Sequence, residues 1–176
     1  MVVRSFVCLF VLLVHSCSDK TAPPQAQQQI YYEVESVNYA YGYQHHGYYI
    51  DQRGGVHSYS FAGTGEMWRD SASRSFSEQT LMKKFSHHDS LLVVADRDSV
   101  LWSYDLVKEA MTGTTTDTIK AGADRGSVSY NVYVFDPGVG MYQRVTLREE
   151  GDWSFHNQSP GAIQLVEWLK KTVRGN

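Results

Sequence analysis

The sequence predicts an α+β domain whose sheet is antiparallel. Two stretches, residues 45–61 and 127–150, have the pattern of β-hairpins, because alternating apolar and polar residues flank a turn that contains glycine. Residues 160–174 have the apolar spacing of an amphipathic helix. Strands and helices do not alternate as they would around a parallel sheet. We therefore expect an antiparallel sheet built from two β-hairpins plus an N-terminal strand, packed by two to three helices including a C-terminal helix.

The first residues of the chain have the pattern of an export signal. Arg4 precedes nine apolar residues at positions 6–14, which is far short of the roughly 20 that a membrane-spanning helix needs. Residues 13–17 read Leu-Val-His-Ser-Cys and resemble the lipobox of bacterial lipoproteins. The resemblance implies cleavage after Ser16 and attachment of lipid, palmitate included, to Cys17. An ordinary signal peptide with the same cleavage site is the alternative, but it would leave Cys17 as a single unpaired thiol.

Lipidation would hold the protein to a membrane and set its location. Two or three acyl chains, at about 0.8 kcal/mol per buried methylene, hold a protein on a bilayer. By resemblance to the lipoprotein sorting rule of Gram-negative bacteria, Ser18 favours the outer membrane, with the domain periplasmic or surface-facing. The residues after Ser18 are rich in proline and glutamine and predict a flexible tether. The expected organisation is a signal peptide at 1–16, the lipidated cysteine and tether at 17–29, and a single α+β domain at 30–176.

Composition narrows the possible partners. The chain has 176 residues with 16 basic and 19 acidic side chains, a formal net charge of -3, and no basic stripe. This argues against nucleic acid and anionic headgroups as partners. Cys8, the other cysteine, lies in the signal, so we expect no disulfide. We predict no cofactor, a membrane contact through the lipid anchor, and an envelope protein or glycan as partner.

The first half of the domain begins with a strand and continues through a short helix. Residues 30–37 alternate with period two, which predicts a strand that buries Ile30 and its alternate neighbours. Ser75 and Glu78 have capping-box spacing ahead of a short helix. Its predicted apolar face is Leu81, Met82 and Phe85. The apolar run at 90–95 predicts a short buried strand or a strand-like link.

The second half contains a longer helix, the second hairpin and the C-terminal helix. Asp98 is expected to cap a helix that ends at Gly113, with an apolar stripe at Val100, Leu101, Tyr104, Val107 and Met111. In the hairpin, Val128, Tyr130, Val132 and Val134 are expected on one face.

The C-terminal helix is the clearest element. Ser159 is its predicted N-cap and Pro160 its first residue. Its predicted buried stripe is Ala162, Leu165, Val166, Leu169 and Val173, with Trp168 beside it. Residues 150–171 look like the C-terminal ends of small uncharacterised bacterial lipoproteins, a resemblance that brings no known activity.

Two histidines suggest an enzyme as the alternative function. His45, Tyr49 and His57 resemble the pattern of NlpC-type peptidases and lecithin:retinol acyltransferase-like enzymes. That chemistry uses a cysteine thiolate activated by an imidazole, and the mature domain has no free cysteine. A degenerate or serine-based relative that uses His45 and His57 is therefore the alternative. A non-catalytic binding or structural module is favoured, because no nucleophile with its base is found.

Histidines and tyrosines offer two further interpretations. The adjacent pairs at 45–46 and 87–88 would point apart, so no metal site is predicted. Eight of the twelve tyrosines lie between Tyr31 and Tyr59, either covering one sheet face or forming a binding face. The candidates for such a binding face are Tyr41, Tyr43, Tyr49 and Tyr59.

Overall fold

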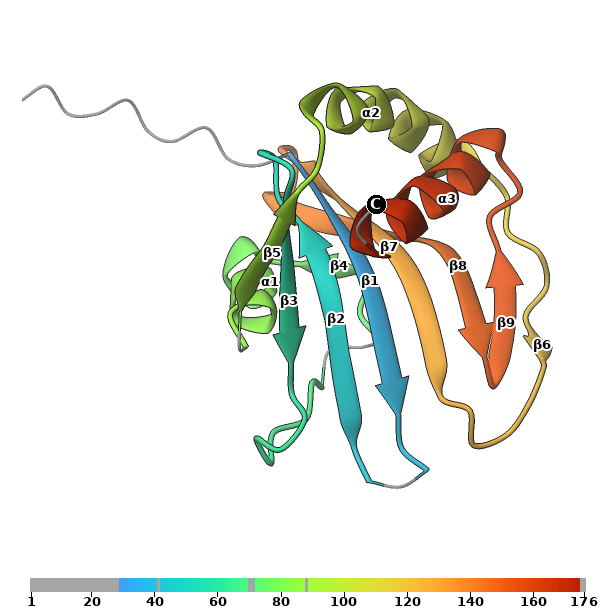
Figure 1. Ribbon diagram of the computed structural model, residues 1–176. Coiled ribbons are helices and arrows are strands. Elements are labelled where there is room, and N and C mark those ends of the chain that lie inside the picture. The colour runs from blue at the N-terminus through green and yellow to red at the C-terminus, as the bar shows by residue number, and fades with distance from the viewer. Residues whose placement is uncertain (1–28, 41, 70–71, 88, 175–176) are drawn as a thin grey trace, which may run out of the picture.

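The computed structural model describes residues 29–40, 42–69, 72–87 and 89–174. Figure 1 shows a curved sheet with two helices across one of its faces. The elements follow in the order β1 (Ile30–Asn38), β2 (Gln44–Ile50), β3 (Gly55–Ser60), β4 (Ser75–Phe76), α1 (Glu78–Phe85), β5 (Ser90–Val94), α2 (Arg97–Thr112), β6 (Ile119–Lys120), β7 (Ser127–Asp136), β8 (Met141–Gly151), β9 (Trp153–His156) and α3 (Pro160–Arg174).

The sheet is antiparallel and is organised around the N-terminal strand. Within the described residues it has nine strands, eight of them in the order β5-β3-β2-β1-β7-β8-β9-β6, with β4 paired to β8. The hairpin β2–β3 lies on one side of β1 and the hairpin β7–β8 on the other. Two hairpins, an N-terminal strand and a C-terminal helix confirm the predicted fold class. The short strands β4, β6 and β9 were not predicted, whereas β5 forms where a strand or a strand-like link was expected.

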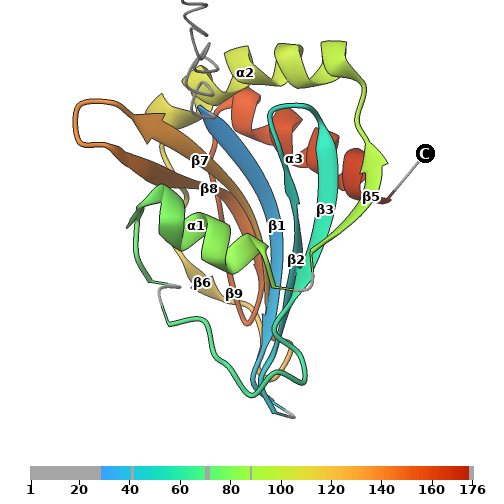
Figure 2. The same ribbon diagram turned by 90° about the vertical axis from the view of Figure 1, so that its left-hand side faces the viewer.

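Each face of the sheet has its own apolar core. Figure 2 shows α1 on the face opposite to α2 and α3. Because neighbouring residues of a strand point to opposite faces, Tyr32 enters the core under α2 and α3, whereas Tyr31 enters the core under α1. The α1 core is largely aromatic and includes Tyr49, Tyr59, Tyr133 and Tyr142. The tyrosine enrichment of the sequence therefore covers the second sheet face.

Helix α3 has the predicted cap and the predicted buried face. The Ser159 hydroxyl accepts a hydrogen bond from the backbone N–H of Ala162 at 3.1 Å. Its buried side is Gly161, Ala162, Leu165, Val166, Trp168 and Leu169, and Val173 packs against the same core. At Gly161 the helix passes so close to α2 that an added Cβ would lie 2.7 Å from the carbonyl oxygen of Leu106.

The other two helices begin at different residues than predicted. Helix α1 is capped by Ser77, whose hydroxyl accepts from the Thr80 backbone N–H, while Ser75 belongs to β4. Helix α2 is capped by Asp96 instead of Asp98. In both cases a second capping residue two positions away has the same local chemistry. The buried face of α2 is Val100, Ser103, Val107 and Ala110, and the predicted stripe residues Leu101 and Met111 are exposed.

The run at 90–95 forms a strand, but the prediction that this strand is buried was wrong. Strand β5 lies at the edge of the sheet, and all five of its residues are exposed. An apolar run is typical of a strand covered on both faces. Here helices lie over other strands and leave β5 open.

The predicted membrane anchor lies outside the described residues. The signal peptide, Cys17 and all but the last residue of the predicted tether fall within 1–28. Among the helices of the described ranges, none is both long and apolar enough to cross a bilayer.

Candidate functional site

A cluster of charged side chains is buried between α1 and the sheet. Glu33, Glu35 and His45 come from β1 and β2, and Lys84 comes from α1. Their residues are between 0% and 6% exposed, which is rare for charged groups unless they are paired. We call these four residues the buried ionic cluster. It is the most unusual chemistry in the described part of the chain.

The strand register brings the cluster together. Glu33 and Glu35 are two positions apart on β1, so both side chains point to the α1 face. On β7, Asn131 lies opposite Glu33 and Ser129 lies opposite Glu35. On β2, Gly47 lies opposite Glu35, and a Cβ there would lie 2.6 Å from the Tyr59 hydroxyl oxygen. A residue larger than glycine at position 47 would therefore displace Tyr59.

Lys84 connects the two carboxylates. Its Nζ lies 2.7 Å from Oε1 of Glu33 and 2.7 Å from Oε1 of Glu35. Burial acts to lower the pKa of the Lys84 ammonium, but the two carboxylates outweigh burial and raise that pKa. Burial likewise acts to raise the pKa of the Glu35 carboxyl, but Lys84 and His45 hold it well below its usual range. Lys84 and Glu35 therefore form an ion pair in the folded protein.

Neutral donors saturate the Glu33 carboxylate. The Tyr59 hydroxyl donates to Oε1 at 2.6 Å, and the Tyr133 hydroxyl donates to Oε2 at 2.7 Å. The Asn131 side-chain amide also donates to Oε2, at 3.2 Å. Burial first, and then the charge of Glu33, raises the pKa of both tyrosines well above its usual value. Both phenols therefore stay protonated and serve as donors.

His45 extends the cluster toward the surface. Its Nε2 lies 2.7 Å from Oε1 of Glu35 in an ion-pair contact. Its Nδ1 lies 2.6 Å from the Tyr43 hydroxyl, which also accepts the backbone N–H of Trp68 at 2.9 Å. The Tyr43 hydroxyl thus joins His45 to the backbone of Trp68, while Nε2 of the same ring faces a carboxylate. The chain of contacts therefore runs from Trp68 through Tyr43 and His45 to Glu35.

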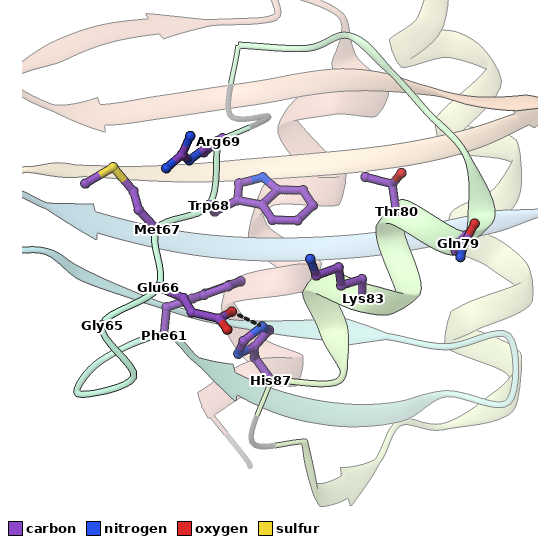
Figure 3. A pocket seen from close by; sticks show the side chains of 10 residues that line it. All are labelled: Phe61, Gly65, Glu66, Met67, Trp68, Arg69, Gln79, Thr80, Lys83 and His87. Carbon is purple, nitrogen blue, oxygen red and sulfur yellow. Dashed lines mark ion pairs between the residues drawn. The ribbon is translucent and has the colours of Figure 1, made fainter.

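A cleft of about 990 Å³ opens beside this chain of contacts, between residues 61–69 and α1. We call it the α1 cleft. Figure 3 shows the side chains that line it, with Trp68 extending toward Thr80 of α1. Phe61 and Trp68 are buried side chains of its wall, with ring centroids 6.1 Å apart. Polar lining residues are Glu66, Arg69, Gln79, Thr80, Lys83 and His87.

The wall of the cleft rests directly on the buried ionic cluster. The Phe61 ring stacks on the His45 ring at 4.8 Å and on the His87 ring at 4.1 Å. The Lys84 ammonium lies 5.6 Å from the Trp68 ring, within range of a cation–π contact. The indole N–H of Trp68 is buried and has no hydrogen-bond partner among the described residues. The cleft thus combines a fixed aromatic wall, an unused donor and several polar groups.

A second, smaller cavity reaches the cluster from the other side. It measures about 220 Å³, and its lining includes Glu35, Ser129, Asn131, Arg144 and Glu149. The Ser129 hydroxyl donates to Oε2 of Glu35 at 3.3 Å. Burial raises the pKa of the Glu149 carboxyl. Glu35 therefore borders this cavity as well as the interior of the cluster.

The structure separates the two candidate catalytic histidines. His45 lies across from Phe61 and His57 across from Tyr49, so they are four residues, about 13 Å, apart along the hairpin. His57 stacks on Tyr49 and has Asp51 and Asp89 as ion-pair partners, at 3.3 and 3.1 Å. In the described ranges, no serine or threonine hydroxyl is hydrogen-bonded to either ring. The two histidines thus belong to separate carboxylate contacts.

The three candidate tyrosines that the structure describes, Tyr43, Tyr49 and Tyr59, do not form an exposed face. Tyr49 and Tyr59 are buried in the α1 core, so the expectation of exposure was wrong for these two. Tyr43 is half-buried and holds Trp68 and His45 as described above. Tyr41 lies outside the described residues. The tyrosines act instead as hydrogen-bond donors and ring contacts inside the domain.

The described residues contain no group of three or more histidine, cysteine, aspartate or glutamate side chains that could hold a metal ion. His46 is exposed, while His45 points inward, as expected for neighbours on a strand. The predicted pair at 87–88 is described in its first member alone.

No protein-family model, no curated protein and no solved structure matches this chain. Its function is therefore inferred from the geometry of the site.

Proposed function

We propose that this protein is a lipid-anchored binding module of the bacterial cell envelope, and that its ligand binds in the α1 cleft. The observation that carries the binding site is the aromatic wall, Phe61 and Trp68, fixed on the buried ionic cluster. Ligand sites are commonly concave, largely preformed and lined by apolar side chains with a few polar groups. The α1 cleft has the concave shape and aromatic side chains of such sites, but six of its ten lining residues are polar, which favours a polar ligand.

The polar groups of the cleft favour an acidic ligand. Arg69 and Lys83 supply two cations, and the negative Glu66 is 3.3 Å from His87. Cations bind carboxylates through charge-assisted hydrogen bonds, which are stronger than neutral ones. Gln79 and Thr80 can bond hydroxyl and amide groups. Groups that bind hydroxyls beside two cations suit an acidic sugar, so we propose an acidic glycan fragment of the envelope as the ligand.

A hydrolase is the less supported alternative. Both ring nitrogens of His45 are occupied, Nδ1 by the Tyr43 hydroxyl at 2.6 Å and Nε2 by Glu35 at 2.7 Å. General-base catalysis would need a hydroxyl or water within about 3 Å of a free ring nitrogen. The same histidine instead supports the wall of the cleft through its contact with Phe61.

The cleft makes a direct prediction for binding. Soluble peptidoglycan fragments that carry carboxylates should bind the protein, and Lys83→Ala should weaken binding about tenfold through loss of one charge-assisted contact. Isothermal titration calorimetry measures this. Lys108→Ala is the matched control, because Lys108 is also exposed but lies on α2, over the other face of the sheet.

Neutral N-acetylglucosamine oligomers separate the role of charge from that of the rings. They should bind more weakly than the acidic fragments, and Lys83→Ala should change their affinity little. Two results would count against the α1 cleft as a glycan site. One is an equal loss of affinity in the Lys83→Ala and Lys108→Ala proteins, and the other is a titration in which no glycan gives a heat of binding.

The anchor is tested separately. We expect the protein to fractionate with outer membranes of a Gram-negative host and to need detergent for release. Cys17→Ser should move it to the soluble fraction, since no thiol then remains to carry the lipid. Mass spectrometry of the N-terminal peptide checks the modification. An unmodified Cys17 in a protein that is soluble without detergent would disprove the lipoprotein assignment.

A further inference from the structure

The smaller cavity, of about 220 Å³, lies over the three neighbouring strands β1, β7 and β8. We call it the β7 cavity. Three of its lining residues form one row across these strands, because Ser129 lies opposite Glu35 on β1 and opposite Glu149 on β8. Paired strands are about 4.8 Å apart, so the Cα atoms of the two glutamates are about 10 Å apart. The row therefore places two carboxylates on opposite sides of a small space.

The polar groups at the centre of the β7 cavity have already used their protons. The Asn131 amide donates to Glu33 at 3.2 Å and to the Ser129 hydroxyl at 2.9 Å. The Ser129 hydroxyl donates its own proton to Glu35, and the Thr146 hydroxyl donates to the side-chain oxygen of Asn131. A hydroxyl has one proton but two lone pairs. What these groups can still offer a ligand is therefore oxygen lone pairs, which accept hydrogen bonds.

Glu149 adds a carboxylate that has no partner of its own. Within the described ranges its side chain makes neither a hydrogen bond nor an ion pair. Burial raises the pKa of this carboxyl, the nearby Arg144 acts against burial, and the charge of Glu35 adds to it. Lys84, which holds Glu35, lies on the far side of that residue in the buried ionic cluster. A positive group between the two carboxylates would stabilise the ionised form of Glu149.

We propose that the β7 cavity binds a small primary amine, whose ammonium group lies between Glu35 and Glu149. An ammonium has three N–H donors and no acceptor, which matches a space that offers oxygen lone pairs. Its hydrogen bonds to the carboxylates are charge-assisted and therefore stronger than neutral ones. The cavity has the volume of about seven water molecules, so the ligand has few non-hydrogen atoms. This site is separate from the α1 cleft and does not depend on the glycan proposed there.

A titration of the ¹⁵N-labelled full-length protein with ethanolamine, followed by NMR, tests the proposal. Saturable shifts are expected at the backbone amides of Ser127, Ser129 and Glu149, which line or flank the cavity. Two other small molecules separate the contributions to binding. Ethylene glycol has the size of ethanolamine but no charge, and choline has the charge but no N–H donor. Neither should give these shifts.

Two variants locate the site. Glu149→Gln keeps the shape of the side chain and removes its charge, so it should weaken ethanolamine binding about tenfold. Glu150→Gln is the matched control, because Glu150 is the next residue of β8 and forms ion pairs with Arg148 and Lys170 instead. This control should bind like wild type. Lys83→Ala should do so too, which makes the result independent of the α1 cleft.

Four results would overturn the proposal. They are the absence of shifts at these amides, shifts that choline reproduces, an equal loss of affinity in Glu149→Gln and Glu150→Gln, and shifts that calcium chloride gives and ethanolamine does not. The last result would make the β7 cavity a metal site.

Discussion

Replacing Lys84 with methionine is expected to destabilise the protein by about 3–5 kcal/mol, because it leaves two buried carboxylates without their cation. Methionine has nearly the same length as lysine and keeps the packing between Tyr59 and Trp68. The loss of stability therefore measures the effect of removing the positive charge and not the effect of a cavity. Urea unfolding followed by circular dichroism measures it. Lys83→Met is the matched control, since this neighbouring lysine is exposed and should change stability by less than about 0.5 kcal/mol.

The pH dependence of the same two proteins identifies the cause. Because Lys84 and His45 outweigh burial and hold the pKa of Glu35 below its usual range, this carboxylate stabilises the folded state above its unfolded pKa of about 4.3. The contribution is lost as the pH falls below that value. In Lys84→Met burial remains without the ammonium, so the pKa of Glu35 should rise and protonation should relieve the strain. The stability difference between wild type and variant should therefore shrink in acid.

A second substitution can recover part of the loss. Glu35→Gln in the Lys84→Met background removes one unpaired charge, so the double variant should be more stable than Lys84→Met alone. A double variant that loses the sum of both single effects would mean that Lys84 and Glu35 are not coupled. That result would contradict the ionic cluster as the base of the cleft.

The cluster was not predictable from the sequence, although the strand that carries it was. Alternation along residues 30–37 places Glu33 and Glu35 on one face, and a polar face of a strand is ordinarily solvated. What buries that face is α1 with Trp68, which approach from distant positions in the chain. A signal was present in the many tyrosines, since phenols can satisfy a buried carboxylate where aliphatic side chains cannot.

Local sequence patterns predicted the helices and strands better than they predicted which residues of these elements are buried or lie close together. The hairpins and the C-terminal helix have turn glycines, caps and stripes within a few residues, and these determine local structure. The burial of β5 and the separation of His45 from His57 depend on sheet order and register. A spacing of twelve residues across a hairpin suggests that the two histidines lie close together. The turn at 51–54 instead places their rings at different levels of the strands.

The other large effect is expected in α3. Leu165 and Leu169 are fully buried between this helix and the sheet, so Leu165→Ala and Leu169→Ala should each cost about 2–5 kcal/mol through lost contacts and the cavity that remains. Both variants should show a lower urea midpoint with an unchanged slope. Ile163→Ala on the same helix is the control, because Ile163 is exposed and should matter little.

The alternative role for α3, as a membrane-surface or partner helix, predicts the opposite pattern. In that case Ile163→Ala would weaken membrane or partner binding, and the two leucine variants would unfold at the wild-type midpoint. The contacts favour the core, since Trp168 of the same helix packs edge-on against Tyr32 of the central strand at 5.0 Å. The basic residues of the last turn, Lys171 and Arg174, lie where the helix dipole favours positive charge. Loss of stability in both leucine variants, with the Ile163→Ala midpoint unchanged, is therefore the expected result.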